Sequence, residues 1–367
     1  MPAQELATDA AIGSLEVVHL FYDAMPTGVT VSRGGRIFVN YPKWGDDVAF
    51  TVGEVRDGEV RPYPSQAFND NDHDADPDAL VSVQSVVVDP ADRLWILDTG
   101  SPMMNPTTHG GPKLVCVDLS RDEVVTTILF QPDVALPTTY LNDVRFDLRR
   151  GPGGTAFITD STDSGPNGII VVDLDTGQSW RRLHDHPSTK GLAPPDLQLV
   201  VEGEQFLKRS EDGTVSPVTF GSDGIAISAD GARLFYCPLA SRRLWSVAVD
   251  TLMDRDSDDD AVASVVDEGD KGSAGDGMET DAQGRIYVTC GERNSVDRRL
   301  PDGSWETVVH DARLLWPDTM SVATDGYLYV TANNLHRQPA FRGGKDERHK
   351  PYALFRTRID AGPVTLR

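Results

Sequence analysis

Six polar residues recur at one fixed distance before six turns of the chain. Five of these turns can be superimposed, and a polar residue stands eight places before each of Gly35, Asp92, Gly231, Gly284 and Gly326. The third turn is longer, but Asp147 matches Asp89 and Asp281, and this match places Asn142 in the same position. We call the set the register residues: Thr27, Gln84, Asn142, Asp223, Asp276 and Asp318.

Three register residues are aspartates, which can act as general bases or ligate a cation. If the six positions surround one axis, the carboxyl groups of Asp223, Asp276 and Asp318 repel one another and raise each other's pKa. Such a cluster indicates either a bound cation or an acid that stays protonated, and both are typical of functional sites. The structural alternative is that short polar residues cap the loops that lead into strands.

A repeated strand-turn-strand pattern positions these residues. Each repeat has an alternating apolar stretch, a Gly- or Asp-containing turn and then a dense apolar and aromatic stretch. The second stretches are 36–39, 93–97, 155–159, 233–237, 285–289 and 327–331. Asp-Gly and Gly-Gly turns are typical of β-hairpins, and no segment shows the sustained 3.6-residue periodicity of a helix. We therefore predict an all-β protein.

Six repeats predict a six-bladed β-propeller. An isolated four-stranded blade cannot bury both of its faces, so six blades must stack radially into a closed ring. We expect residues 15–21 and 352–359 to meet in the closing blade, which leaves 1–14 as an N-terminal extension and 15–367 as one propeller domain. Each register residue then begins the innermost strand of its blade, so the six side chains are expected around one mouth of the central channel.

The composition disfavours several classes of partner. A formal net charge of −23 opposes binding to nucleic acid or anionic membranes and favours small molecules or cations. There is no run of eighteen apolar residues, and residues 1–10 do not resemble a secretory signal. The three cysteines lie in separate apolar stretches, so we predict free thiols at Cys116, Cys237 and Cys290 and a cytoplasmic protein.

Several segments resemble the Yellow and major royal jelly protein family, in that family's order. Residues 82–89, running into 93–100, resemble its most recognisable segment. The other matching segments are 38–44, 62–65, 141–143, 158–161, 179–181, 223–228, 237–241, 316–319 and 325–328. The resemblance covers binding proteins and enzymes alike. Single cysteines, where secreted insect members are expected to carry disulfides, indicate a bacterial-type member.

The register residues also resemble the ligands of the gluconolactonase, regucalcin and paraoxonase-like lactonase propellers, which hold a divalent cation with Glu, Asn, Asn and Asp. Asn142, Asp223 and Asp276 stand at the positions similar to Asn, Asn and Asp. Thr27 replaces the glutamate, and Asp318 is able to supply the missing charge. The resemblance implies a divalent cation held by Asn142, Asp223, Asp276 and Asp318. Hard oxygen ligands of this kind favour Ca²⁺ over Zn²⁺.

Residues close to the register are candidates for ligand contacts. We predict this role for Gln84, Tyr140, Trp316 and His109, with aromatic core packing as the alternative for the two aromatic residues. The acidic stretch 69–78 lacks the glycine and terminal glutamate of an EF-hand loop and is interpreted as solvated. Motifs of serine hydrolases, nucleotide-binding proteins and zinc proteases are absent from the sequence.

Two functions fit these observations. The first is an enzyme that hydrolyses a lactone or ester, or isomerises a small cyclic or aromatic metabolite. A cation would polarise a carbonyl oxygen, and one of Asp223, Asp276 and Asp318 would act as the general base. The second is a protein that binds a small amine or aromatic ligand in the same acidic mouth without chemistry. The fold does not decide between them, because propellers host both.

Overall fold

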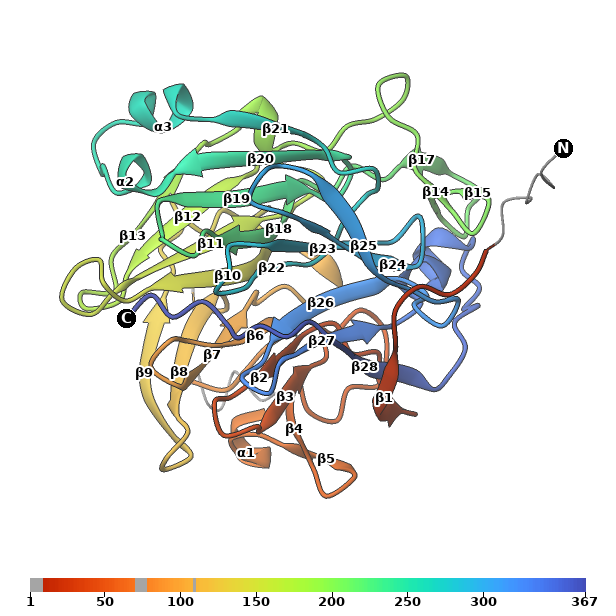
Figure 1. Ribbon diagram of the computed structural model, residues 1–367, viewed down its shortest axis with the longest axis horizontal. Helices are drawn as coiled ribbons and strands as arrows, with labels where there is room; N and C mark the ends of the chain where they lie inside the picture. The colour runs from red at the N-terminus through yellow and green to blue at the C-terminus, as the bar shows by residue number, and fades with distance from the viewer. Residues whose placement is uncertain (1–8, 70–77, 108–109) are drawn as a thin grey trace, which may run out of the picture.

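The computed structural model describes residues 9–69, 78–107 and 110–367, which contain six four-stranded antiparallel sheets arranged around a central axis (Figure 1). Each sheet is one blade, so the predicted six-bladed β-propeller is confirmed. The six predicted apolar and aromatic stretches form the second strand of each blade: β3, β7, β11, β19, β23 and β27.

The blades follow one another along the chain. The first two consist of β2 (Val29–Val31), β3 (Ile37–Asn40), β4 (Val52–Arg56) and β5 (Glu59–Pro62), then β6 (Val83–Val88), β7 (Arg93–Asp98), β8 (Lys113–Asp118) and β9 (Glu123–Leu129). The next two consist of β10 (Leu141–Asp147), β11 (Thr155–Asp160), β12 (Gly168–Asp173) and β13 (Ser179–Arg182), then β18 (Ser222–Ile227), β19 (Arg233–Pro238), β20 (Arg243–Ala248) and β21 (Val266–Asp270). The last two consist of β22 (Met278–Thr280), β23 (Ile286–Cys290), β24 (Ser295–Arg299) and β25 (Trp305–His310), then β26 (Pro317–Val322), β27 (Tyr327–Ala332), β28 (Tyr352–Arg358) and β1 (Glu16–Phe21).

The closing blade joins the two ends of the chain. Strand β1 pairs antiparallel with β28, from Glu16 opposite Arg356 to Phe21 opposite Tyr352. This pairing confirms the prediction for residues 15–21 and 352–359. Because one strand of the sixth blade comes from the start of the chain and three come from its end, the ring is held closed by backbone hydrogen bonds.

The core lies between neighbouring blades. Trp95 of the second blade and Phe146 of the third stack with ring centroids 5.3 Å apart, and Phe157 of the third blade shares a buried cluster with Tyr236 of the fourth. Neighbouring blades therefore bury apolar faces against each other, as the repeat pattern predicts. The cysteines are buried free thiols, which confirms the prediction for Cys116, Cys237 and Cys290.

Two insertions depart from the regular blade plan. Between the third and fourth blades lie two short hairpins, β14 (Val200–Val201) with β15 (Glu204–Gln205), and β16 (Leu207–Arg209) with β17 (Val215–Pro217). Between β27 and β28 lie the 3₁₀ turns η3 (Leu335–Arg337) and η4 (Pro339–Phe341). These two insertions lie close together in space, because β16 contacts η4.

Helices are short and peripheral. They are α1 (Gln66–Asn69), α2 (Val249–Leu252) and α3 (Asp259–Ala263), with further 3₁₀ turns η1 (Pro102–Met104) and η2 (Pro187–Thr189). In the described part of the chain, none is long and apolar enough to cross a membrane.

Candidate functional site

Local irregularities in the inner strands turn the register residues toward the channel. A shift in strand pairing occurs at the register residue in four inner strands: β6, β10, β18 and β26. In β6, for example, the shift lies between Val83 and Ser85. A bulge of this kind re-aims one side chain while the rest of the strand keeps its alternation. The side chains that it re-aims here are Gln84, Asn142, Asp223 and Asp318.

Two glycines bring the beginnings of the inner strands β18, β22 and β26 unusually close. A Cβ atom on Gly224 would lie 2.6 Å from the carbonyl oxygen of Asp276, and one on Gly277 would lie 2.2 Å from that of Asp318. Such contacts are too short for any other residue. The backbones next to Asp223, Asp276 and Asp318 therefore pack directly against one another, and this packing places three carboxyl groups at one point.

A cavity of about 40 Å³ lies at this mouth of the channel, room for about three water molecules. The structure brings five of the six register residues to its wall, together with Tyr140. Thr27 is buried outside it, where its hydroxyl accepts a hydrogen bond from Asn40. Trp316 reaches the site through Asp276 instead of lining the cavity, and His109 lies outside the described residues. The roles predicted for these residues remain predictions.

The three carboxyl groups are electrostatically coupled. The carboxyl groups of Asp223 and Asp276 line the same cavity, and their mutual interaction contributes to the pKa shift of each. Burial, reinforced by the charge of Asp276, raises the pKa of both Asp223 and Asp318 well above the usual range. Burial also raises the pKa of Asp276, but the hydrogen bonds from Asp223 and Trp316 oppose it. The two groups titrate as a coupled pair, and the Trp316 bond favours the ionised form of Asp276.

Nitrogen donors surround the carboxyl groups. The indole Nε1 of Trp316 donates to Oδ2 of Asp276 at 2.7 Å, the amide of Asn142 donates to Oδ1 of Asp223 at 2.6 Å, and the amide of Asn333 donates to Oδ2 of Asp318 at 2.6 Å. Bonds from N–H groups stabilise buried carboxylates without an added cation.

One wall of the cavity is a chain of hydrogen-bonded aromatic and amide groups. The indole Nε1 of Trp44 donates to the hydroxyl of Tyr140 at 2.8 Å, and that hydroxyl donates to Oε1 of Gln84 at 3.0 Å. Burial raises the pKa of Tyr140, so the phenol stays neutral. This wall is therefore mostly aromatic, and the amide of Gln84 is its polar group at the cavity.

The two insertions roof the cavity. Phe206, which follows β15, lies 4.9 Å from Trp316 and 4.7 Å from Phe341 of η4, measured between ring centroids. Phe206 and Phe341 both line the cavity. The roof therefore places aromatic rings over the cavity that the three carboxyl groups line.

A salt-bridge cluster holds the two insertions together. Glu202, between β14 and β15, accepts hydrogen bonds of 2.6 Å from both His336 and Arg337 of η3. Burial disfavours the ionised form of Glu202, but these bonds outweigh it and lower its pKa to about 2. Burial lowers the pKa of His336, whose ring also stacks on Trp316 with centroids 5.8 Å apart. We call the contact of Glu202 with these two residues the roof latch.

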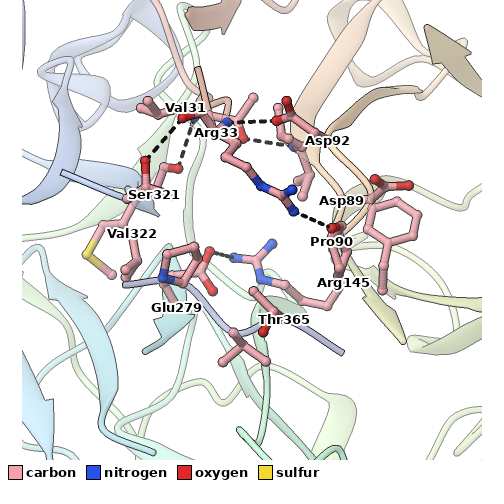
Figure 2. Close-up of a pocket in the computed structure, with 18 of the residues that line it drawn as sticks. Val31, Arg33, Asp89, Pro90, Asp92, Arg145, Glu279, Ser321, Val322 and Thr365 are labelled. Carbon is pink, nitrogen blue, oxygen red and sulfur yellow. Dashed lines mark hydrogen bonds and ion pairs between the residues drawn. The ribbon is translucent and has the colours of Figure 1, made fainter. Parts of the chain in front are cut away.

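A layer of buried ions separates the mouth from the opposite end of the channel. Arg145 forms a 2.9 Å ion pair with Asp143 and a 3.5 Å pair with Glu279. Figure 2 shows Arg145, Glu279 and Arg33 facing a second cavity, of about 170 Å³, into which Thr365 of the C-terminal segment also points. Arg145 therefore offsets negative charge of Asp143 and Glu279 within this layer.

The predicted cation ligands do not fit a metal ion as they stand. Their oxygens have the chemistry that Ca²⁺ prefers. However, Asn142 turns its NH₂ group toward Asp223, and N–H donors occupy an oxygen of Asp276 and of Asp318. Among the described residues, no group of three or more His, Cys, Asp or Glu is arranged to hold a metal ion. The calcium prediction is therefore not confirmed, and no catalytic step is derived through a metal.

Comparison with known proteins identifies the family. A family model described as major royal jelly protein matches residues 81–358. The chain belongs to the major royal jelly protein family. Protein yellow of Drosophila erecta is 28% identical over 258 residues, which cover 66% of this chain and 44% of that protein. The chain spans less than half the length of the curated relatives it matches.

Solved structures similar to this member of the family are also propellers. Regucalcin from Agrobacterium tumefaciens strain C58, described as a calcium-binding protein, aligns with a TM-score of 0.58 and 14% identity over 96% of this chain and 95% of its own. A gluconolactonase from Xanthomonas campestris aligns with a TM-score of 0.54 and 12% identity over 97% of this chain and 99% of its own. At such identities the likeness shows the fold alone. The predicted resemblance to regucalcin and gluconolactonase is confirmed at that level, and the predicted royal jelly resemblance is confirmed as family membership.

The groups that enclose the site are not predicted by the repeats. Phe206 and Glu202 lie in an insertion without repeat equivalents, so no alignment of repeats reveals them. Asn333 follows the end of β27, a strand that runs toward the mouth, and a polar residue at such a strand end is the signal that indicates it.

Proposed function

We propose that this major royal jelly protein family member is an acid–base enzyme that isomerises a small cyclic or aromatic carbonyl compound at the channel mouth. The observation that carries the proposal is that the buried carboxyl groups of Asp223 and Asp276 line one cavity beneath an aromatic roof, each bonded by an N–H donor. Two buried carboxyl groups with one proton between them can give and accept protons at the same time.

We assign the base role to the carboxyl group that the Trp316 indole bonds. Asp276, whose charge is stabilised by Trp316, acts as the base and takes a proton from the carbon next to a carbonyl group. Asp223, the protonated partner, gives its proton to the carbonyl oxygen, and the electrons of the broken C–H bond form the double bond of an enol. In a β,γ-unsaturated carbonyl compound this enol is a dienol. Asp276 then returns the proton to the γ-carbon, the double bonds shift toward the carbonyl group and the enol proton returns to Asp223, which yields the conjugated isomer and restores the pair.

The surroundings support a neutral, flat substrate. Tyr140 and Phe206 offer aromatic faces, and Gln84 offers an amide for one polar group. Asp318, held by Asn333 and with a raised pKa, is placed to donate to a second substrate oxygen. Because the cavity is smaller than a metabolite, the roof must open to admit one.

Deuterium exchange tests the proposal. The protein is incubated in D₂O with 2-indanone, an enolisable cyclic ketone, and with dihydrocoumarin, an aromatic lactone. Protein-dependent deuterium incorporation next to the carbonyl supports proton transfer, whereas ring opening of the lactone alone supports hydrolysis. We expect Asp276→Asn to reduce exchange by about 10²- to 10⁴-fold, the usual contribution of a general base. Thr27→Ser, at the register position outside the cavity, is the matched control and is expected to keep full activity.

Binding without chemistry is the second candidate function, favoured by aromatic faces above three carboxyl groups. A small amine would pair with Asp276 and stack on the roof. Calorimetric binding of 2-phenylethylamine that depends on Asp276, with neither exchange nor ring opening, would support this function and contradict the enzyme.

A further inference from the structure

We propose a second ligand site, for an organic ammonium ion with an apolar body, in a groove between the outer strands of the sixth and first blades. The groove has a volume of about 650 Å³ and lies beside β1 and the β4–β5 hairpin. We call it the rim groove. Its volume lies within the range of about 300–1,000 Å³ that is typical of small-molecule sites. This site does not depend on the proposed function of the channel mouth.

The charges of the rim groove are unbalanced. Asp46 is neutralised by Arg348 at 2.6 Å, but Asp23 and Asp47 have no ion-pair or hydrogen-bond partner in the described part of the chain. Lys350 is the one permanent cation among the described lining residues. A positively charged ligand would therefore offset the charges of Asp23 and Asp47, and the net charge of −23 attracts such ligands.

Tyr41 provides the second and independent observation. Its side chain is 5% exposed and lines the groove, yet its hydroxyl has no hydrogen-bond partner among the described residues. Burial, together with the charge of Asp23, raises the pKa of Tyr41, so the phenol is neutral and Asp23 lies near it. The ring is buried but its oxygen is not fully buried, so the hydroxyl reaches the groove, where water or a ligand can bond it.

The walls select an organic cation over a metal ion. The Tyr41 ring packs edge-on against Phe21 and Phe50, with centroids 6.1 and 5.9 Å away, and Tyr22 stands 64% exposed at the edge of the groove. Aromatic faces bind an alkyl or aryl ammonium by dispersion and cation–π attraction. A Ca²⁺ ion needs six to eight oxygens, which two free carboxylates and one phenol do not supply.

Calorimetry with 2-phenylethylamine, and with 2-phenylethanol as the neutral analogue, tests the site on the full chain. We expect the amine to bind and the alcohol to bind at least tenfold more weakly. Asp47→Asn should weaken amine binding about tenfold, and Tyr41→Phe should weaken it severalfold without altering folding. Asp133→Asn, an equal charge change at an exposed residue outside the groove, should leave the affinity unchanged.

The channel mouth is also acidic, so Asp276→Asn is measured in parallel. Amine binding that survives Asp276→Asn and falls with Asp47→Asn establishes the rim groove. Binding that is lost with Asp276→Asn and unaffected by Asp47→Asn overturns the proposal and places the amine in the channel. Equal binding of amine and alcohol, or no binding of either, also overturns it.

Discussion

The indole nitrogen of Trp316 lies 2.7 Å from Oδ2 of Asp276, and Trp316 itself has a φ angle of 55°. Few residues other than glycine adopt this left-handed conformation, which costs free energy unless surrounding contacts compensate for it. Here the compensation is the bond to a buried carboxyl group and stacking on His336. We therefore interpret the main role of Trp316 as the hydrogen bond to Asp276.

We expect Trp316→Phe to lower the free energy of unfolding by about 1.5–3 kcal/mol, because a hydrogen bond to a buried charged group is lost. Urea unfolding measures the change. Trp44→Phe removes an indole bond to the neutral Tyr140 and should cost about 1 kcal/mol. Equal losses in the two variants would show that the Trp316 bond has no charge-dependent part.

The raised pKa values of the mouth carboxyl groups make stability depend on pH. Between the ordinary aspartate pKa, about 4, and the raised values, the folded protein binds more protons than the unfolded chain. Stability should therefore fall as the pH rises through this window, by at most about 1.4 kcal/mol per pH unit for each group. The slope should be greatest from Asp223 and Asp318.

Asp223→Asn tests this dependence, since it removes one titrating group and keeps the shape. We expect the melting temperature of the variant to exceed that of the wild type increasingly as the pH is raised from 5 to 8. Asp133→Asn, an exposed control, should run parallel to the wild type. A constant difference between Asp223→Asn and wild type across this range would mean that Asp223 has an ordinary pKa.

The fold was predictable because each blade is encoded by a short local sequence pattern and the pattern repeats. Each Asp-Gly or Gly-Gly turn joins two apolar stretches of one blade, and the same spacing from turn to register residue recurs. Alignment of repeats therefore placed Asn142, Asp223, Asp276 and Asp318 at one mouth, and the structure brings them to one cavity.

The compensation of charge at the mouth was not predictable in this way. Three converging carboxyl groups indicated either a cation or a protonated acid, and the choice depends on contacts between blades. Trp316 bonds Asp276 of the preceding blade, and the roof over both comes from an insertion that no other blade repeats. Long-range contacts of this kind leave no periodic signal in the chain.

Calcium titration tests the remaining cation prediction. Because N–H donors occupy the carboxyl groups, we expect neither EDTA nor added Ca²⁺ to shift the melting temperature. A native-state site filled at one hundred times its Kd would instead add about 2.7 kcal/mol of stability. A calcium-dependent rise that disappears in Asp276→Asn would contradict the expectation and show that the mouth rearranges around an ion.

Opening of the roof can be measured at the latch. Glu202 holds His336 and Arg337 across two insertions, so Glu202→Gln should weaken the closed state by about 1.5–3 kcal/mol. Hydrogen exchange at residues 200–206 and 335–341 should then accelerate about 10- to 100-fold at pH 7, if these segments open together. Glu204→Gln, which breaks an ion pair with Arg342 in which Glu204 is 62% exposed, is the matched control and should change exchange little. Because the pKa of Glu202 is about 2, the wild-type latch should stay closed down to about pH 3. Acceleration confined to 200–206 would show that the two insertions move separately, and the roof would then not act as one gate to the carboxyl groups.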